Sequence, residues 1–347
     1  MIIGNLKSNY AADEAILRSW PLRWGFWAAI AVALIAPQFM SGYQLYLTTQ
    51  ATVYLIALVG LNILTGYTGL VSLGHGAMVG VGAYTTAVLA NTYGMPVFVT
   101  IPAAMLMTVA VGLLFGLPSL RIKGLYLTIA TISASFIIVF VLETWESVTN
   151  GDSGITIPPA NIFGIEIVSD QQKFYFILPF AIAAILFGQN LFRTRVGRAF
   201  IAIRDGELSA EIIGVNLMKY KLYSFAIASA LAGLSGALFS YMFLAITPTL
   251  FELPISIQLL AALVIGGVAS TLGPIFGAAF IVMVPEIVKG VLGLLSGGDM
   301  SWAEYTAPAS TLVYGMLIIG FMLFESQGLV AIWRRFWRFV NLWPFRP

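Results

Sequence analysis

The feature that most constrains this sequence is a series of solid apolar runs, each roughly 20 residues long, separated by short polar stretches. A helix of that length spans a bilayer, whereas membrane β-barrels use strands of about ten residues with alternating hydrophobicity. Hydrophobic residues make up 59% of the chain and charged residues only 9%. A soluble domain carries about 25% charged residues, so this chain cannot cover a water-facing surface. The sequence therefore predicts an all-α polytopic membrane protein.

We expect about ten transmembrane helices, some of them broken by glycine or re-entrant. The expected ranges are Trp24–Met40, Gln44–Leu64, Leu70–Ala90, Val97–Leu117, Leu125–Leu142, Phe174–Phe192, Leu222–Ile246, Ile255–Ser270, Ile275–Leu292 and Thr306–Phe324. The third is interrupted by glycines near Gly74, and Gly273-Pro274 separates the eighth from the ninth. Either region could be a broken helix, because irregular backbone at membrane depth is tolerated where protein or a water-filled cavity satisfies it.

The positions of Lys and Arg predict the orientation, since cytoplasmic loops are enriched in both. With a cytoplasmic N-terminus, 15 of the 17 Lys and Arg residues lie inside, and only Lys173 and Lys289 lie outside. We therefore expect both termini in the cytoplasm. Residues 1–23 form a polar arm that does not have the pattern of a cleavable signal peptide. The membrane domain is expected at 24–325, with an inner loop at 193–221, an outer loop at 143–173 and a basic tail at 326–347.

Several kinds of chemistry are excluded by what the chain lacks. It has no Cys and one His, which rules out thiolate and multi-histidine metal sites. There is no Walker A pattern for binding ATP. The formal net charge is only +2, which gives no reason to expect a nucleic-acid partner. We expect no catalytic residue, no metal and no cofactor on this chain.

Two segments rich in small residues are candidates for a substrate pathway, one in each half of the chain. A pair of glycine-interrupted segments points to a route near the membrane midplane. His75 is the only His and lies at membrane depth, where an ionisable group is a functional candidate. It could instead bond a nearby backbone carbonyl, and the glycines could serve close helix packing. The candidate pathway residues are Ser72, His75, Gly76, Gly80, Tyr84, Gly266, Gly267 and Ser270.

The inner loop 193–221 is longer than ten packed helices need. Apolar residues such as Ile203 and Ile212 alternate with charges over Ile201–Val215, which predicts one or two amphipathic helices, and Gly214 is placed to end them. They could form a solvated surface or dock a cytoplasmic partner. The candidate coupling residues are Arg204, Glu207, Ala210, Glu211, Gly214 and Val215.

Five motifs in order carry a resemblance to a known family. They are GYTGLVSLGHGA from Gly66, GVGAY ending at Tyr84, RIKGLYLT from Arg121, GRAFIAIR ending at Arg204, and VIGGVASTLGPIFGA from Val264. They resemble the permeases of bacterial branched-chain amino acid ABC importers, above all the longer, LivM-type subunit. The resemblance covers roughly residues 60–325.

The resemblance implies a permease subunit of the inner membrane that carries branched-chain or other hydrophobic amino acids. Its implied partners are a second permease subunit, two cytoplasmic ATPases that bind the ATP, a periplasmic binding protein and membrane lipid. The family's EAA-type docking loop corresponds here to 208–214, with the leading Glu displaced to Glu207. Related permeases import urea, short amides or aromatic acids, so these substrates stay open. The second function class is a secondary transporter or channel that works alone.

Overall fold

The computed structural model describes residues 34–119, 124–162, 164–295 and 328–342, together with positions 308–309, 312–313, 315–317 and 319–320. Four predicted features therefore lie wholly or largely outside the described residues. They are the N-terminal arm 1–23, most of the expected helix Trp24–Met40, the charged turn with Arg121 and Lys123, and much of the expected helix Thr306–Phe324. Arg346 of the basic tail also lies outside them.

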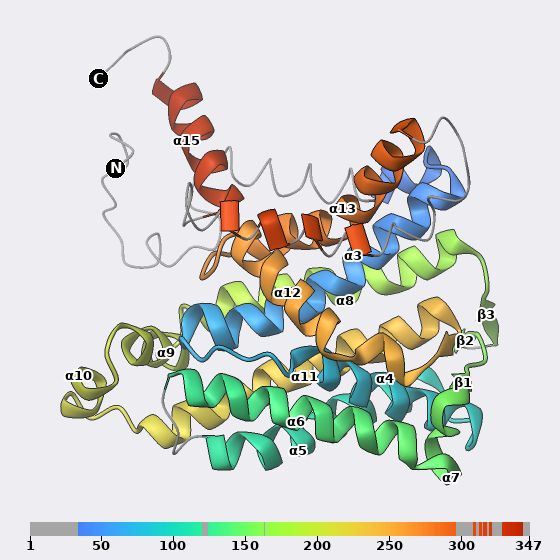
Figure 1. Cartoon of the computed structure of the whole chain (residues 1–347), viewed down its shortest axis with the longest axis horizontal. Coiled ribbons are helices and arrows are strands. Elements are labelled where there is room, and N and C mark those ends of the chain that lie inside the picture. Colours follow the sequence, from blue (N-terminus) through green and yellow to red (C-terminus); the bar gives the residue numbers. More distant parts are fainter. Residues whose placement is uncertain are drawn as a thin grey trace.

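Helices form nearly all of the described structure (Figure 1). The longer ones are α3 (Gly42–Leu61), α4 (His75–Asn91), α5 (Val97–Ser119), α6 (Leu125–Thr144), α8 (Asp170–Leu191), α11 (Leu217–Phe243), α12 (Leu253–Gly266), α13 (Gly273–Leu295) and α15 (Leu329–Leu342). The short ones are η1 (Ala36–Gln38), α7 (Glu146–Thr149), η3 (Gly151–Ser153), α9 (Arg195–Asp205), α10 (Glu207–Ile212) and η4 (Pro248–Phe251), and the π-helix η2 (Asn62–Tyr67) continues α3.

The all-α membrane fold predicted from the sequence is confirmed. Among the described residues, seven helices are long and apolar enough to cross a membrane. They correspond to α3 with η2, α5, α6, α8, α11, η4 with α12, and α13. The helix α4 has only 17 residues and begins at His75, five residues later than expected, because residues 68–74 are irregular. The predicted total of ten crossings stays a prediction.

Two helices form the centre of the bundle. In the most apolar part of α11, 72% of the residues are buried, and in that of α3 the share is 67%, against 33% in α5. The outer helices instead expose large apolar side chains, such as Leu106 on α5, Phe140 on α6 and Met283 on α13. Such a surface is stable against lipid and costly in water, which fits the membrane assignment.

The polar connections gather at the two ends of the bundle (Figure 1). At one end lie α9 and α10. At the other lie α7 and the strands β1 (Ile155–Thr156), β2 (Ala160–Ile162) and β3 (Ile165–Ile167). β2 pairs antiparallel with β3, and β1 pairs with β4 (Ala245–Ile246), which follows α11 directly. The predicted inner and outer loops therefore lie at opposite ends of the same helices.

Both of those loops are shorter than the sequence suggested, because local hydrogen bonds extend the neighbouring helices. Ser169 and Gln172 form a capping box, so α8 begins at Asp170 rather than Phe174. The Asn216 side chain accepts a hydrogen bond from the Lys219 N–H, so α11 begins at Leu217 rather than Leu222. The boundaries 143–173 and 193–221 thus become about 145–169 and 192–216.

Candidate substrate pathway and coupling surface

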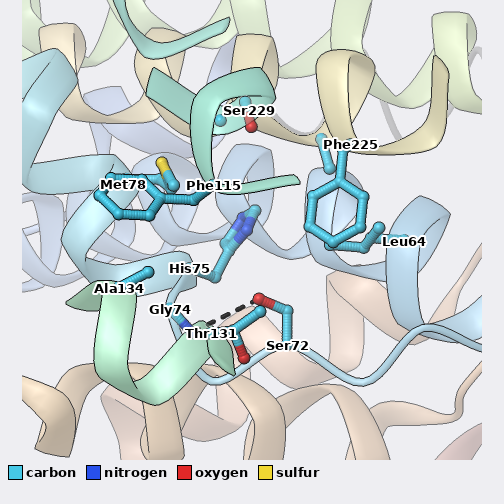
Figure 2. A pocket seen from close by; sticks show the side chains of 12 residues that line it. Leu64, Ser72, Gly74, His75, Met78, Phe115, Thr131, Ala134, Phe225 and Ser229 are labelled. Carbon is cyan, nitrogen blue, oxygen red and sulfur yellow. Dashed lines mark hydrogen bonds between the residues drawn. The ribbon is translucent and has the colours of Figure 1, made fainter. Parts of the chain in front are cut away.

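A small cavity lies beside the start of α4, in the heart of the bundle. Figure 2 shows the His75 ring between Phe115 of α5 and Phe225 of α11, above the irregular segment that carries Ser72. Polar side chains of Thr131 on α6 and Ser229 on α11 also line it. Its volume of about 20 Å³ is room for about one water molecule. The cavity therefore cannot hold an amino acid in this conformation.

His75 bonds a backbone carbonyl, although the partner is not among the glycines that precede it. Its Nε2 lies 2.9 Å from the carbonyl oxygen of Ala57 on α3, and only 2% of the residue is exposed. Because a carbonyl can only accept, Nε2 carries the proton in this bond. The bond joins α4 to the central helix α3. A direct role of His75 in contacting substrate or protons stays a prediction.

The irregular segment before His75 is fastened by hydroxyl groups rather than by helical hydrogen bonds. The Leu73 N–H donates to Thr131 Oγ1 at 3.1 Å, and the Gly74 N–H donates to Ser72 Oγ at 3.4 Å. A side chain at Gly74 would meet the Thr131 carbonyl oxygen at 2.7 Å. The break in the predicted third helix is thus held against α6.

Three predicted pathway residues share the side of α4 that packs on 248–256. The Gly76 N–H donates to Ser256 Oγ at 2.9 Å. A Cβ at Gly80 would lie 2.9 Å from the Phe251 side chain. The Tyr84 ring meets Phe251 edge-on, and its buried hydroxyl has no hydrogen-bond partner among the described residues. In this conformation the small residues allow close packing.

The other predicted pathway residues form the turn between α12 and α13. Gly266 is the last residue of α12, and Gly267 follows it with φ +122°. The sequence placed Gly267 inside a helix, whereas the structure places it in the turn after the helix. Its positive φ is a backbone conformation that residues other than glycine rarely adopt. Ser270 Oγ donates to the Gly267 carbonyl at 2.8 Å and accepts from the Gly273 N–H at 2.9 Å.

Asn62 holds this turn against η2 and was missed in the sequence. Its Nδ2 donates to the Ser270 carbonyl at 2.8 Å, and its Oδ1 accepts from the Ala269 N–H at 2.9 Å. The residue is 3% exposed. A lone Asn inside an apolar run was the available signal, because a buried amide must find partners.

The predicted coupling residues lie in α9 and α10 or directly after α10, at one end of the bundle. The apolar side of α9 faces inward, with Phe200 and Ile203 buried. The short α10 behaves differently, since only Ala210 is buried among its residues. Leu208 and Ile212 in α10 and Ile213 directly after it form an exposed apolar patch. Their exposed fractions are 71%, 85% and 73%. We call these three residues the α10 patch.

Gly214 ends α10 as predicted. Its φ is +87°, the Gly214 N–H donates to Glu211, and the Val215 N–H donates to the Ala210 carbonyl. This pair of bonds is the Schellman arrangement, in which glycine at the left-handed position closes a helix. The termination fixes where the α10 patch ends.

A buried ion pair mounts α10 on the central helix α11. Lys221 Nζ lies 2.5 Å from Glu207 Oε1, and 4% of the lysine side chain is exposed against 25% of the glutamate. Lys221 was assigned to the loop from the sequence, and the early start of α11 places it in the helix. Sequence reasoning had no local signal for this pair, because its members are 14 residues apart.

Arg204 joins α9 to η2. Its Nη1 donates to the Gly66 carbonyl at 3.2 Å, and its Nη2 lies 3.2 Å from Asp205. Beside this contact, Tyr67 stacks on Phe192 at the end of α8, with ring centroids 3.3 Å apart. The helix α9 therefore contacts the same π-helix that Asn62 connects to the α12–α13 turn.

The described residues contain no group of three metal-ligating side chains.

Comparison with known proteins gives a consistent family. The sequence model of the protein family described as branched-chain amino acid transport system, permease component, matches residues 43–323. No solved structure matches.

Three relatives illustrate the range of names. The chain is 30% and 31% identical to the high-affinity branched-chain amino acid transport system permease proteins LivM of Salmonella typhimurium and Escherichia coli, over 88% of this chain and 74% of each relative. It is 27% identical to the fructose import permease protein FruG of Bifidobacterium longum, over 78% of this chain and 79% of the relative. The matched length and the LivM identities show that this chain belongs to the family of branched-chain amino acid transport system permease components.

Proposed function

We propose that this chain is one transmembrane subunit of an ABC importer for branched-chain or other hydrophobic amino acids. It would work with a second permease subunit, two cytoplasmic ATPases and a periplasmic substrate-binding protein. ATP would be hydrolysed on the ATPases, and the chain itself would supply half of the route and a surface that receives their motion. The relatives named for branched-chain amino acids support the substrate class.

The α10 patch is the observation that carries this proposal. Three large aliphatic side chains are almost fully exposed at a polar end of the bundle, where water would meet them. An apolar patch of this kind, rimmed by charges such as Glu211, marks an interaction site. A helix that presents its apolar face to a groove is a recurrent mode of recognition. The patch supports docking of a protein partner rather than a solvated surface.

The contacts that join α9 and α10 to the rest of the bundle can transmit a movement of the α10 patch. The Glu207–Lys221 pair connects α10 to α11, and Arg204 connects α9 to the carbonyl of Gly66. Asn62 then connects η2 to the backbone of the α12–α13 turn. A movement of α10 would therefore reach both the central helix and the second glycine-rich segment. Packed helices move as rigid bodies between discrete arrangements, so these polar contacts can transmit a movement from one helix to the next.

The proposed pathway runs along the two glycine-rich segments, Ser72–Tyr84 and Ile265–Phe276. The cavity beside His75 holds about one water, so the described conformation corresponds to a closed route. The buried hydroxyls of Tyr84 and Thr86 have no hydrogen-bond partner among the described residues. Buried polar groups are rarely left unpaired. We infer that these hydroxyls face the route when α4 separates from its neighbours.

The proposed orientation places 192–216 and both termini in the cytoplasm. Residues 145–169 would then face the periplasm of a bacterial inner membrane and meet the binding protein. The distribution of Lys and Arg supports this arrangement. The strand pair β1–β4 and the cap of α8 give the periplasmic side a folded surface on which a protein can seat.

The deciding experiment is affinity purification of the tagged chain from mild detergent extracts of its own membranes. We expect one second permease chain and two ATPase chains for each copy of this chain, and ATP hydrolysis stimulated by substrate-loaded binding protein. Purification of this chain alone, with uptake driven by an ion gradient in vesicles, would support the stand-alone transporter instead. Adding leucine, urea, a short amide, an aromatic acid or fructose to the binding protein separates the substrate alternatives, of which fructose enters through the relative FruG.

A further inference from the structure

The helix α15 has two sharply different faces. Its sequence, LVAIWRRFWRFVNL, contains three arginines and no acidic residue. At 100° per residue, positions 334, 335, 338 and 341 share an arc of about 120°, while 332, 333, 336, 339 and 340 lie on the opposite side. The first set holds Arg334, Arg335, Arg338 and Asn341, with Ala331 and Leu342 on the same arc, and the second holds Ile and aromatic residues with one Val. Arginines opposite Trp and Phe are typical of helices that lie in a membrane interface.

The beginning of α15 is seated on the bundle. Gly328 has φ +68°, and a side chain there would meet the Ile265 carbonyl oxygen at 2.6 Å. Val330 is 2% exposed, and the Trp333 ring centroid lies 5.9 Å from that of Phe276 on α13. These contacts place α15 beside the α12–α13 turn.

Past this seat, α15 leaves the bundle. In Figure 1 it runs steeply across the direction of α6 and α11. Those helices cross the membrane, and α15 starts beside the α12–α13 turn, toward the end of the bundle that carries α9. A helix that runs steeply across the spanning helices at that end lies along the membrane surface. Its apolar side is not fully covered by protein, because Ile332 is 49% and Trp333 42% exposed. The neighbouring helix α13 also exposes large apolar side chains, such as Met283 and Ile287.

We propose that α15 is a membrane-surface helix that binds anionic phospholipid headgroups through Arg334, Arg335 and Arg338. Its apolar face enters the acyl boundary beside α13, and the arginines lie at the level of the phosphates. Guanidinium groups bind phosphate oxygens in paired, charge-assisted hydrogen bonds. The attraction of a basic residue to an anionic membrane surface amounts to about a fivefold preference for each residue.

The absence of cysteine allows a direct test on the full chain. Val340→Cys and Leu342→Cys place a nitroxide on opposite faces of α15, two residues apart, because positions 340 and 342 differ by about 200°. The purified chain is reconstituted in nanodiscs of phosphatidylcholine alone or mixed equally with phosphatidylglycerol. Accessibility to oxygen reports burial in lipid, and accessibility to a nickel chelate reports exposure to water.

In the mixed lipid we expect the label at 340 to be oxygen-accessible and shielded from nickel, and the label at 342 to show the reverse. Changing Arg334, Arg335 and Arg338 to Gln should shift the equilibrium between membrane-bound and detached α15 roughly a hundredfold toward the detached state. It should also abolish the effect of phosphatidylglycerol. Changing all three to Lys keeps the charge but not the paired hydrogen bonds, so it should keep the dependence on phosphatidylglycerol in weaker form. Unchanged thermal unfolding of these variants will show that the bundle is intact.

Three results would overturn the proposal. They are equal accessibility at 340 and 342, independence from phosphatidylglycerol, or shielding of the 340 label from both reagents, which would mean that protein covers this face. The readout involves neither substrate nor ATPase, so the outcome is separate from that of the proposed transport function.

Discussion

Replacing Asn62 with Leu tests whether η2 really holds the α12–α13 turn. The side chain makes two hydrogen bonds to that turn, one from Nδ2 to the Ser270 carbonyl and one to Oδ1 from the Ala269 N–H. Leu has a similar size, so the change leaves little cavity and mainly removes the two bonds. The Ala269 N–H and the Ser270 carbonyl then lose a partner in a site that is 3% exposed at Asn62.

The magnitude follows from what such bonds contribute inside membrane proteins. Interhelical polar contacts in bilayers average about 0.6 kcal/mol and reach about 1.7 kcal/mol, a range similar to the net contribution of a hydrogen bond in water-soluble proteins. Two bonds therefore contribute about 1–3 kcal/mol. At about 2 °C per kcal/mol for a chain of this size, Tm should fall by about 2–6 °C. Thermal unfolding in one detergent measures it.

Asn91→Leu is the matched control, since Asn91 is exposed at the end of α4. That variant should unfold close to the wild type. If Asn62→Leu also leaves Tm unchanged, the bridge between η2 and the turn carries no energy and the reasoning about transmission is wrong. If the bridge transmits motion, Asn62→Leu should in addition reduce substrate-stimulated ATP hydrolysis more than basal hydrolysis in the assembled complex.

Further predictions concern orientation, coupling and the pathway. In intact spheroplasts, a thiol reagent that cannot cross the membrane should label Ser153→Cys and not Ser209→Cys, both exposed positions; the opposite pattern would invert the topology. Gly214→Val places a β-branched residue at φ +87° and should abolish substrate-stimulated ATP hydrolysis. The control Gly94→Val, at φ +60° at the opposite end of the bundle, should leave that hydrolysis unchanged. Equal effects of the two variants would mean that Gly214 has only a structural role. Gly80→Ala should lower Tm by overpacking worth about 1–3 kcal/mol. It should also reduce uptake of Phe more than of Val per assembled complex, while a uniform loss would leave Gly80 as a packing residue.

Much of the fold could be predicted because a membrane enforces simple patterns. An apolar run must become a helix, since only a helix satisfies its own backbone within lipid. The cores of α3, α5, α6, α8, α11 and α13 therefore lie where the sequence placed them. The boundaries moved where a side chain several residues outside the apolar run caps the helix, as Ser169 and Asn216 do.

The contacts that organise the site could not be predicted, because they join distant parts of the chain. The glycines near 74 and the Gly273-Pro274 pair predicted irregular backbone, and the irregular segments are 68–74 and 267–272, the second of them starting earlier than expected. The partner of His75, however, is a carbonyl on α3, and the partner of Lys221 lies on α10. A pattern shows that a polar group needs a partner, while only the packing of the helices decides which one it meets.

The central claim, that an ATPase docks on α10, is tested most directly by cross-linking from the α10 patch. A photoreactive probe attached to Ile212→Cys in the otherwise Cys-free chain is activated in native membranes, with a probe on Ser153→Cys as the control at the other end of the bundle. We expect Ile212 to capture a chain that contains an ATP-binding P-loop, and Ser153 to capture none. Capture of lipid alone from Ile212, or of the ATPase from Ser153, would contradict the account.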